Sequence, residues 1–201
     1  EYMIERMIKE DLLQPVDKSL IPNLDNINEG ILGQSFDLSN NYWVPYFCGN
    51  VGILYDKTVV DEKDLEAGWS ILRNTKYKNQ IYMYDSERDS FMVALKALGY
   101  SMNTTKEREI NEAYQWLLEQ REEMNPVYVG DESIDTMISG VKAMAIMYSG
   151  DAAAVMSENP NMGYYMPKEG TNVWFDGFVI SKECKQTKLA NEFINYMISD
   201  K

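Results

Sequence analysis

An indole and a carboxylate stand two positions apart at the head of the apolar segment that runs from Trp174 to Ser181. In a β-strand, residues two apart point to the same side, so Trp174 and Asp176 would line one surface together. The face of an indole attracts a cation, and a carboxylate accepts charge-assisted hydrogen bonds. The pair is therefore suited to hold a protonated amine. The alternative is a strand that buries one tryptophan and exposes one aspartate.

Other carboxylates lie beside aromatic or polar residues further upstream. Asp151 follows Tyr148 at the end of an apolar run, and Asp89 follows Ser86 after a short strand. Each has a structural explanation as well, because aspartate is a good N-cap and a helix dipole favours an acid in the first helical turn. Tyr2 fits either a pocket wall or a core. The sequence leaves both interpretations of each residue open.

The elements that would position these side chains alternate along the chain. Strands are expected at residues 42–55, 79–84, 126–129, 143–148, 163–166 and 173–180. Helices are expected at residues 2–13, 61–74, 89–98, 107–123, 131–139, 152–156 and 188–199, with one or two helical turns within 21–32. This order is typical of an α/β protein with a mainly parallel sheet. Ligands bind such sheets beyond the carboxyl ends of the strands, and the three aspartates lie near strand–helix junctions.

Composition excludes several classes of function. The 201 residues suffice for one large domain or two small lobes. A net charge of −13 argues against a nucleic-acid partner and is compatible with attraction of cations. The absence of histidine removes histidine-based acid–base catalysis and most zinc sites, and no cofactor or metal motif is present. No run of eighteen apolar residues occurs. Cys48 and Cys184 lack metal-binding spacing and are expected to be buried thiols, with a disulfide left open.

Four stretches of the chain resemble the polyamine-binding proteins of ABC importers, the spermidine/putrescine receptors. They are residues 41–46, 90–104, 148–151 and 166–176, the last carrying a specific Pro-Lys-Glu-Gly and Trp-x-Asp sequence. The resemblance covers essentially the whole chain. It implies a periplasmic-binding-protein-like fold of type II, whose two lobes close on an extended polyamine without catalysis. It also implies an ABC permease and ATPase as membrane partners and an extracytoplasmic location, periplasmic or lipid-anchored at the cell surface; we expect a monomer.

The resemblance implies mainly the second lobe together with parts of the first. Residues 48–173 would form the second α/β lobe, residues 1–47 part of the first lobe, and residues 174–201 the return strand and helix of the first lobe. The first residues read like the interior of a domain, and family members are longer. We therefore expect a fragment truncated at both ends. Because one side of the clamp is missing, we expect it to bind polyamine weakly or not at all.

The resemblance also implies roles for the aromatic residues. Trp174 would stack on the alkyl chain of the polyamine, and Asp176 would pair with an ammonium group. Tyr148 stands where the family usually has tryptophan. Tyr2 matches the aromatic residue of a Ser-x-Tyr motif whose serine would precede this chain.

Three further positions bear on the choice of ligand. Asp151 matches the acid of putrescine-type members, and Asp89 stands where glutamate is common. Ser86 replaces an aspartate that some spermidine binders carry. The shorter carboxylate at Asp89 and the loss of one charge at Ser86 slightly favour putrescine as the ligand, and spermidine stays open.

Other functions stay open at this point. One is a receptor of the same fold for another solute, such as a sugar, an amino acid or another cation. An amino-acid receptor usually needs an arginine for the carboxylate, whereas the positions named above are acids. A hydrolase that uses a pair of carboxylates is a second alternative, although the sequence does not fix the separation of the carboxyl groups. A surface interaction module without a small ligand is the third.

Overall fold

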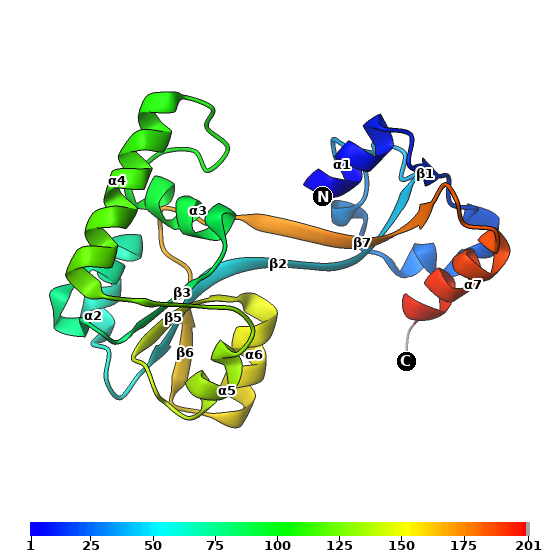
Figure 1. The fold of residues 1–201 in the computed structure, drawn as a ribbon. Helices are drawn as coiled ribbons and strands as arrows, with labels where there is room; N and C mark the ends of the chain where they lie inside the picture. Colours follow the sequence, from blue (N-terminus) through cyan, green and yellow to red (C-terminus); the bar gives the residue numbers. More distant parts are fainter. Residues whose placement is uncertain (200–201) are drawn as a thin grey trace. The chain divides into compact units, whose positions relative to one another are not determined.

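The chain divides into two compact units in the computed structural model, which describes residues 1–199 (Figure 1). Unit 1 combines Glu1–Cys48 with the segment from Trp174 onward, and unit 2 is the continuous segment Gly49–Val173. The chain therefore passes between the units twice, once within β2 (Trp43–Asp56) and once at the start of β7 (Val173–Ser181).

Unit 1 is built on a small piece of sheet flanked by helices. The strand β1 (Leu13–Gln14) pairs antiparallel with the end of β7, and β7 lies between β1 and β2 in the strand order. The helices are α1 (Tyr2–Lys9) and α7 (Thr187–Met197), and short 3₁₀ turns occupy Lys18–Leu20, Pro22–Asn26 and Glu29–Ile31. The predicted strand at residues 173–180 and the predicted helix at residues 188–199 are confirmed, and each boundary agrees within two residues.

The two faces of β7 contact different parts of the core of unit 1. Phe175 and Val179 pack against the cluster around Trp43, whereas Phe178 and Ile180 belong to the cluster of Val44 and α7. Gly177 lies on the Trp43 face, where a Cβ atom would come within 2.5 Å of the indole and 2.6 Å of the Val44 carbonyl oxygen. Side chains of β7 therefore alternate in orientation as the strand geometry requires.

Unit 2 is a mixed sheet in the order β6-β2-β5-β3-β4. The strands are β3 (Ile81–Tyr84), β4 (Val127–Val129), β5 (Met144–Tyr148) and β6 (Met162–Tyr165), with the second part of β2. The pairs β3–β4 and β3–β5 are parallel, but β2 pairs antiparallel with both β5 and β6. The expectation of a mainly parallel sheet is wrong for this reason; the parallel part is limited to three neighbouring strands.

Helices cover both faces of this sheet (Figure 1). One face packs against α3 (Glu87–Ala97) and α4 (Glu107–Met124), in a core that contains Ile53 and Met83. The other packs against α5 (Ser133–Ile138) and α6 (Ser149–Glu158), in a core that contains Leu54 and Tyr82. Neighbouring residues of one strand point to opposite cores, so the buried strands are apolar on both faces.

The predicted helix at residues 61–74 is broken in the structure. It consists of α2 (Glu62–Leu65), followed by 3₁₀ turns at Gly68–Arg73 and Thr75–Tyr77. Gly68 has a φ of +61°, a left-handed conformation that interrupts a right-handed helix. The carboxylate of Glu169 occupies the space that a side chain at position 68 would need. The spacing of apolar residues cannot reveal this long-range contact, and for this reason it predicts one continuous helix.

Two other expectations also need correction. The first helix ends at Lys9 instead of residue 13, because Asp11 adopts a φ of +55° and Leu13 enters β1. Both cysteines are free thiols, and Cys48 is exposed and Cys184 half-buried, so the expectation of two buried thiols is wrong. Among residues 1–199, no helix has the length and apolar character needed to cross a membrane.

Candidate functional site

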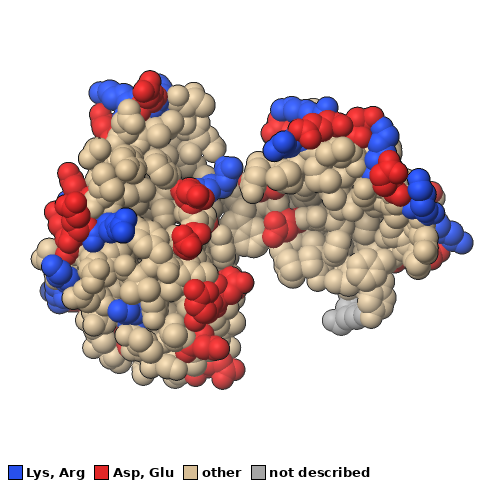
Figure 2. Space-filling view, viewed as in Figure 1, with Lys and Arg blue, Asp and Glu red and all other residues tan. Residues whose placement is uncertain are grey.

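Polar side chains gather in unit 2 where the three parallel strands end. Ser86 follows β3, Asp131 follows β4 and Tyr148 is the last residue of β5. Because β3 lies between β5 and β4 and runs parallel to both, these ends share one edge of the sheet. The carboxyl edge of parallel strands is the usual place for a ligand in an α/β sheet. Figure 2 shows acidic side chains on the side of unit 2 that carries α5 and α6, and others on the side that carries α4.

Asp89 is the buried acid of this cluster, with a relative exposure of 5%. It lies in the first turn of α3, whose N-cap is Ser86, and the backbone N–H of Asp89 donates to the Ser86 hydroxyl at 3.4 Å. Its Oδ2 accepts a hydrogen bond of 2.8 Å from the hydroxyl of Tyr148, and its Oδ1 accepts one of 3.4 Å from the amide of Asn172. The helix terminus and two donors together hold a carboxylate in a buried position.

Tyr148 is held by a second tyrosine. Its backbone N–H donates to the hydroxyl of Tyr84 at 2.8 Å, and the two rings stack with centroids 4.6 Å apart. Burial raises the pKa of Tyr148, and the hydrogen bond to the Asp89 carboxylate raises this pKa further. Burial likewise raises the pKa of Tyr84. Both phenols therefore stay neutral at physiological pH, and Tyr148 keeps the proton that it donates to Asp89.

Asp151 lies in the first turn of α6, half-buried, and Tyr148 is the N-cap of that helix. The structural alternative of an N-cap role for Asp151 is therefore wrong. Burial raises the pKa of Asp151, and the negative charge of Asp131 raises it further. A carboxylate that is partly removed from water and lies near another acid gains from a cation placed next to it.

The remaining predicted residues belong to unit 1. Trp174 and Asp176 lie on one face of β7, as the spacing predicts, with Trp174 half-buried and Asp176 exposed. Tyr2 is 56% exposed at the start of α1. The amino group of Glu1 donates to the carbonyl oxygen of Phe175 at 3.3 Å, which holds the start of α1 against the same part of β7.

The seven predicted residues thus form two groups, each within one unit. Unit 2 carries four of them, namely Ser86, Asp89, Tyr148 and Asp151, and unit 1 carries the other three. Sequence reasoning did not single out Tyr84, Asp131 or Asn172 as members of the site. Tyr84 ends one predicted strand, and Asp131 begins the predicted helix that follows another, which is a signal that could have identified them.

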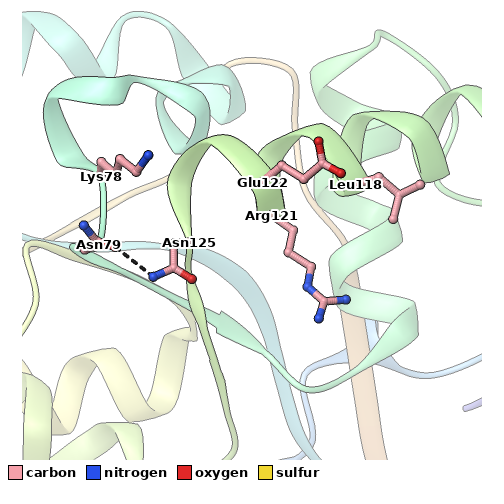
Figure 3. Close-up of a pocket in the computed structure, with 6 residues that line it drawn as sticks. All are labelled: Lys78, Asn79, Leu118, Arg121, Glu122 and Asn125. Carbon is pink, nitrogen blue, oxygen red and sulfur yellow. Dashed lines mark hydrogen bonds between the residues drawn. The ribbon is translucent and has the colours of Figure 1, made fainter.

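Figure 3 shows a hollow of about 610 Å³ elsewhere in unit 2, lined by Lys78, Asn79, Leu118, Arg121, Glu122 and Asn125. Its two asparagines are joined by a hydrogen bond of 2.8 Å, and they lie two residues before β3 and β4, respectively. The hollow therefore lies at the amino ends of the parallel strands, opposite to the acidic cluster. Its lysine and arginine are exposed, and it contains none of the predicted residues.

Comparison with known proteins identifies the protein family to which the chain belongs. The family of bacterial extracellular solute-binding proteins matches residues 1–201, and the chain belongs to this family. It is an extracytoplasmic class of solute receptors, not of enzymes, and this sets the carboxylate-pair hydrolase aside.

Individual relatives are named for the polyamines that they bind. The chain is 30% identical over 200 residues to the spermidine/putrescine-binding periplasmic protein of Salmonella typhimurium, covering 98% of this chain and 56% of the relative. It is 29% identical over 209 residues to a putrescine/cadaverine-binding protein of Pseudomonas aeruginosa, covering 97% and 58%. A putative spermidine/putrescine ABC transporter protein from Listeria monocytogenes has a similar structure, with 37% identity, a TM-score of 0.89, and coverage of 98% and 61%. The chain thus spans little more than half the length of these curated relatives.

Proposed function

We propose that this chain is part of the solute receptor of an ABC importer and that the solute is a linear polyamine, putrescine or spermidine. The observation that carries the proposal is the buried carboxylate of Asp89, which is held in place by Tyr148, the N-cap of the helix that carries Asp151. The names of the relatives support the same class of ligand.

The charge of the site favours a cation over a neutral or anionic solute. The donors that hold the carboxylate of Asp89 within unit 2 are a phenol and a side-chain amide, and both are neutral. The negative charge of this buried group, with Asp151 and Asp131 near the same edge, is therefore available to a cationic ligand. An ammonium group that leaves water needs compensating acceptors of this kind. A neutral sugar would not compensate the negative charge of these acids, and an amino-acid receptor would need an arginine.

Each residue has a role in this proposal. In unit 2, Asp89 and Asp151 would accept hydrogen bonds from an ammonium group, and the Tyr148 ring would contact methylene groups. Ser86 would contribute a hydroxyl at the same helix terminus. In unit 1, the family likeness assigns Trp174 and Tyr2 to the alkyl chain and Asp176 to an ammonium group. The ABC permease and ATPase are the proposed membrane partners.

A thermal-shift titration tests the proposal. This chain and a full-length version are each titrated with putrescine, spermidine and cadaverine, and 1,4-butanediol serves as an uncharged control of the same length as putrescine. We expect the diamines to raise the melting temperature of the full-length protein and butanediol to leave it unchanged. A shift in the full-length protein alone would show that a segment outside this chain is needed. No shift with any polyamine in either protein would overturn the proposal.

A further inference from the structure

Asn172 connects the acidic cluster to the backbone of a strand. It directly precedes β7, and it is buried within unit 2 with a relative exposure of 7%. Its Oδ1 accepts a hydrogen bond of 3.0 Å from the backbone N–H of Val51 in β2, and its Nδ2 donates to Oδ1 of Asp89 at 3.4 Å. The side chain therefore touches two segments that are far apart in the sequence.

The orientation of this amide is fixed by its two partners. A backbone N–H can only donate and an ionised carboxylate can only accept, so the oxygen of Asn172 must face Val51 and the nitrogen must face Asp89. The single hydroxyl proton of Thr171 has two acceptors within reach, the same Oδ1 at 3.2 Å and the carbonyl oxygen of Val51. The opposite amide orientation would place donor against donor at one end and acceptor against acceptor at the other.

We propose that Asn172 is a positioning residue of the polyamine site, which ties the carboxylate of Asp89 to the backbone of β2 at Val51. The inference rests on the proposed function. Tyr148 donates to one carboxylate oxygen and Asn172 to the other, so the two residues fix the plane of the carboxylate. The direction in which Asp89 presents its remaining acceptor sites to an ammonium group follows from that plane.

The chemistry of position 172 requires an amide. A leucine would leave the N–H of Val51, a fully buried residue, without its acceptor. An aspartate would keep that acceptor but set a second carboxylate against Asp89. Repulsion between two such groups raises their pKa in the folded state above the unfolded value.

A double-mutant cycle on the whole chain tests the contact without any ligand. The variants are Asn172→Asp, Asp89→Asn and the double variant, and the melting temperature is measured from pH 3 to pH 8. We expect Asn172→Asp to lower the melting temperature by about 3 °C or more at pH 7. Because the folded pKa of the carboxylate pair is raised, this loss must disappear as the pH falls below the unfolded pKa of about 4.

The double variant reverses the polarity of the contact and should rescue it. The amide introduced at position 89 would donate to the carboxylate introduced at position 172, and that carboxylate would still accept from the N–H of Val51. The pH-dependent loss should therefore be absent. A role of Asn172 that did not involve Asp89 would give a loss that is independent of pH and additive in the double variant. That result would overturn the proposal.

Putrescine binding, measured by calorimetry on the full-length protein, provides the functional readout. Asn172→Ala should weaken binding about 10-fold, and the control Asn161→Ala, on the exposed loop before β6, should not. Unchanged affinity in Asn172→Ala would also overturn the positioning role. If the unaltered full-length protein bound no polyamine, the proposed function would fail, whereas the pH-dependent cycle would still report on the contact with Asp89.

Discussion

The hydroxyl of Tyr148 donates a 2.8 Å hydrogen bond to Oδ2 of Asp89, and this joins the end of β5 to the first turn of α3. Asp89 has a relative exposure of only 5%, so its charge depends on protein donors for stabilisation in the free receptor. In the proposed function, the acceptor directions of the carboxylate that these donors leave unused would receive the ammonium group of the ligand.

Replacement of Tyr148 by phenylalanine removes this donor but keeps the ring. We expect a loss of about 1.5–3 kcal/mol in the free energy of unfolding, because the hydrogen bond serves a buried charge. Urea unfolding measures the loss. Tyr82→Phe is the matched control, because Tyr82 is also buried in the sheet and its hydroxyl forms none of the hydrogen bonds described. Equal effects of the two changes would contradict a special role of the Tyr148 hydroxyl.

The raised pKa of Asp151 makes the stability of the chain depend on pH. Its folded pKa lies above the unfolded value because of burial and Asp131, so ionisation costs stability. This cost is absent below the unfolded pKa of about 3.9 and fully present above the folded pKa. Asp151→Asn should therefore raise the melting temperature at pH 7 and leave it nearly unchanged at pH 3. Asp131→Asn should lower the pKa of Asp151 in a carboxyl ¹³C titration; no change would contradict the assigned cause.

Trp174→Ala and Asp176→Asn test the group on unit 1 in the full-length protein. A desolvated cation–π contact is worth about 2 kcal/mol, so the loss of Trp174 should weaken putrescine binding about 30-fold. Loss of the Asp176 charge should weaken binding roughly 10- to 150-fold. Glu183→Gln, which removes an exposed charge just beyond β7, is the control. Unchanged affinity in both variants would remove this face of β7 from the site.

Gly177→Ala should destabilise unit 1 by about 1–3 kcal/mol, as overpacking of a core does. The new methyl group would lie 2.6 Å from the carbonyl oxygen of Val44, which belongs to a paired strand and has little freedom to move. Gly150→Ala is the control, because Gly150 lies within α6 and the added methyl group would meet no atom within 4 Å apart from its chain neighbours and the backbone of α6. That change should be neutral or stabilising by about 0.5–1 kcal/mol. Urea unfolding measures the free energy of unfolding of both variants. A Gly177→Ala variant as stable as the Gly150→Ala variant would contradict the predicted clash with Val44.

Local patterns predicted most of the elements but few of the irregularities. The six strands that the sequence indicates are all present, and α3 begins after an N-cap at Ser86, a residue type that favours this position. These features depend on alternating or capping residues that are close together in the chain. The break at Gly68 depends on Glu169, and the direction of β2 depends on its partners. Neither contact leaves a periodic trace in the sequence.

The candidate site also combines residues that local sequence patterns predict with residues that only long-range contacts reveal. Asp89, Tyr148 and Asp151 were predicted from their places beside strand ends, and the structure brings them to one edge of the sheet. The contact of Asn172 with Asp89 spans 83 residues and involves an amide, a group that occurs in many turns. Its residue type carried no signal, and only the fold identifies its partner.

The hydrogen bond between Val51 and Asn172 joins residues that are 121 positions apart. These two residues lie near the first and last residues of unit 2, so folding of unit 2 brings its two ends together. Unit 1, in contrast, must bring together Gln14 and Ser181, which are 167 residues apart. The prior closure of unit 2 shortens the free chain between them and lowers the entropic cost of this step by about 1 kcal/mol. Pulse-labelled hydrogen exchange should therefore protect the amides of β5 before those of β1. During synthesis on a ribosome, all of unit 2 is made before β7 and α7 of unit 1. Unit 1 can therefore complete its folding only after unit 2 has been synthesised.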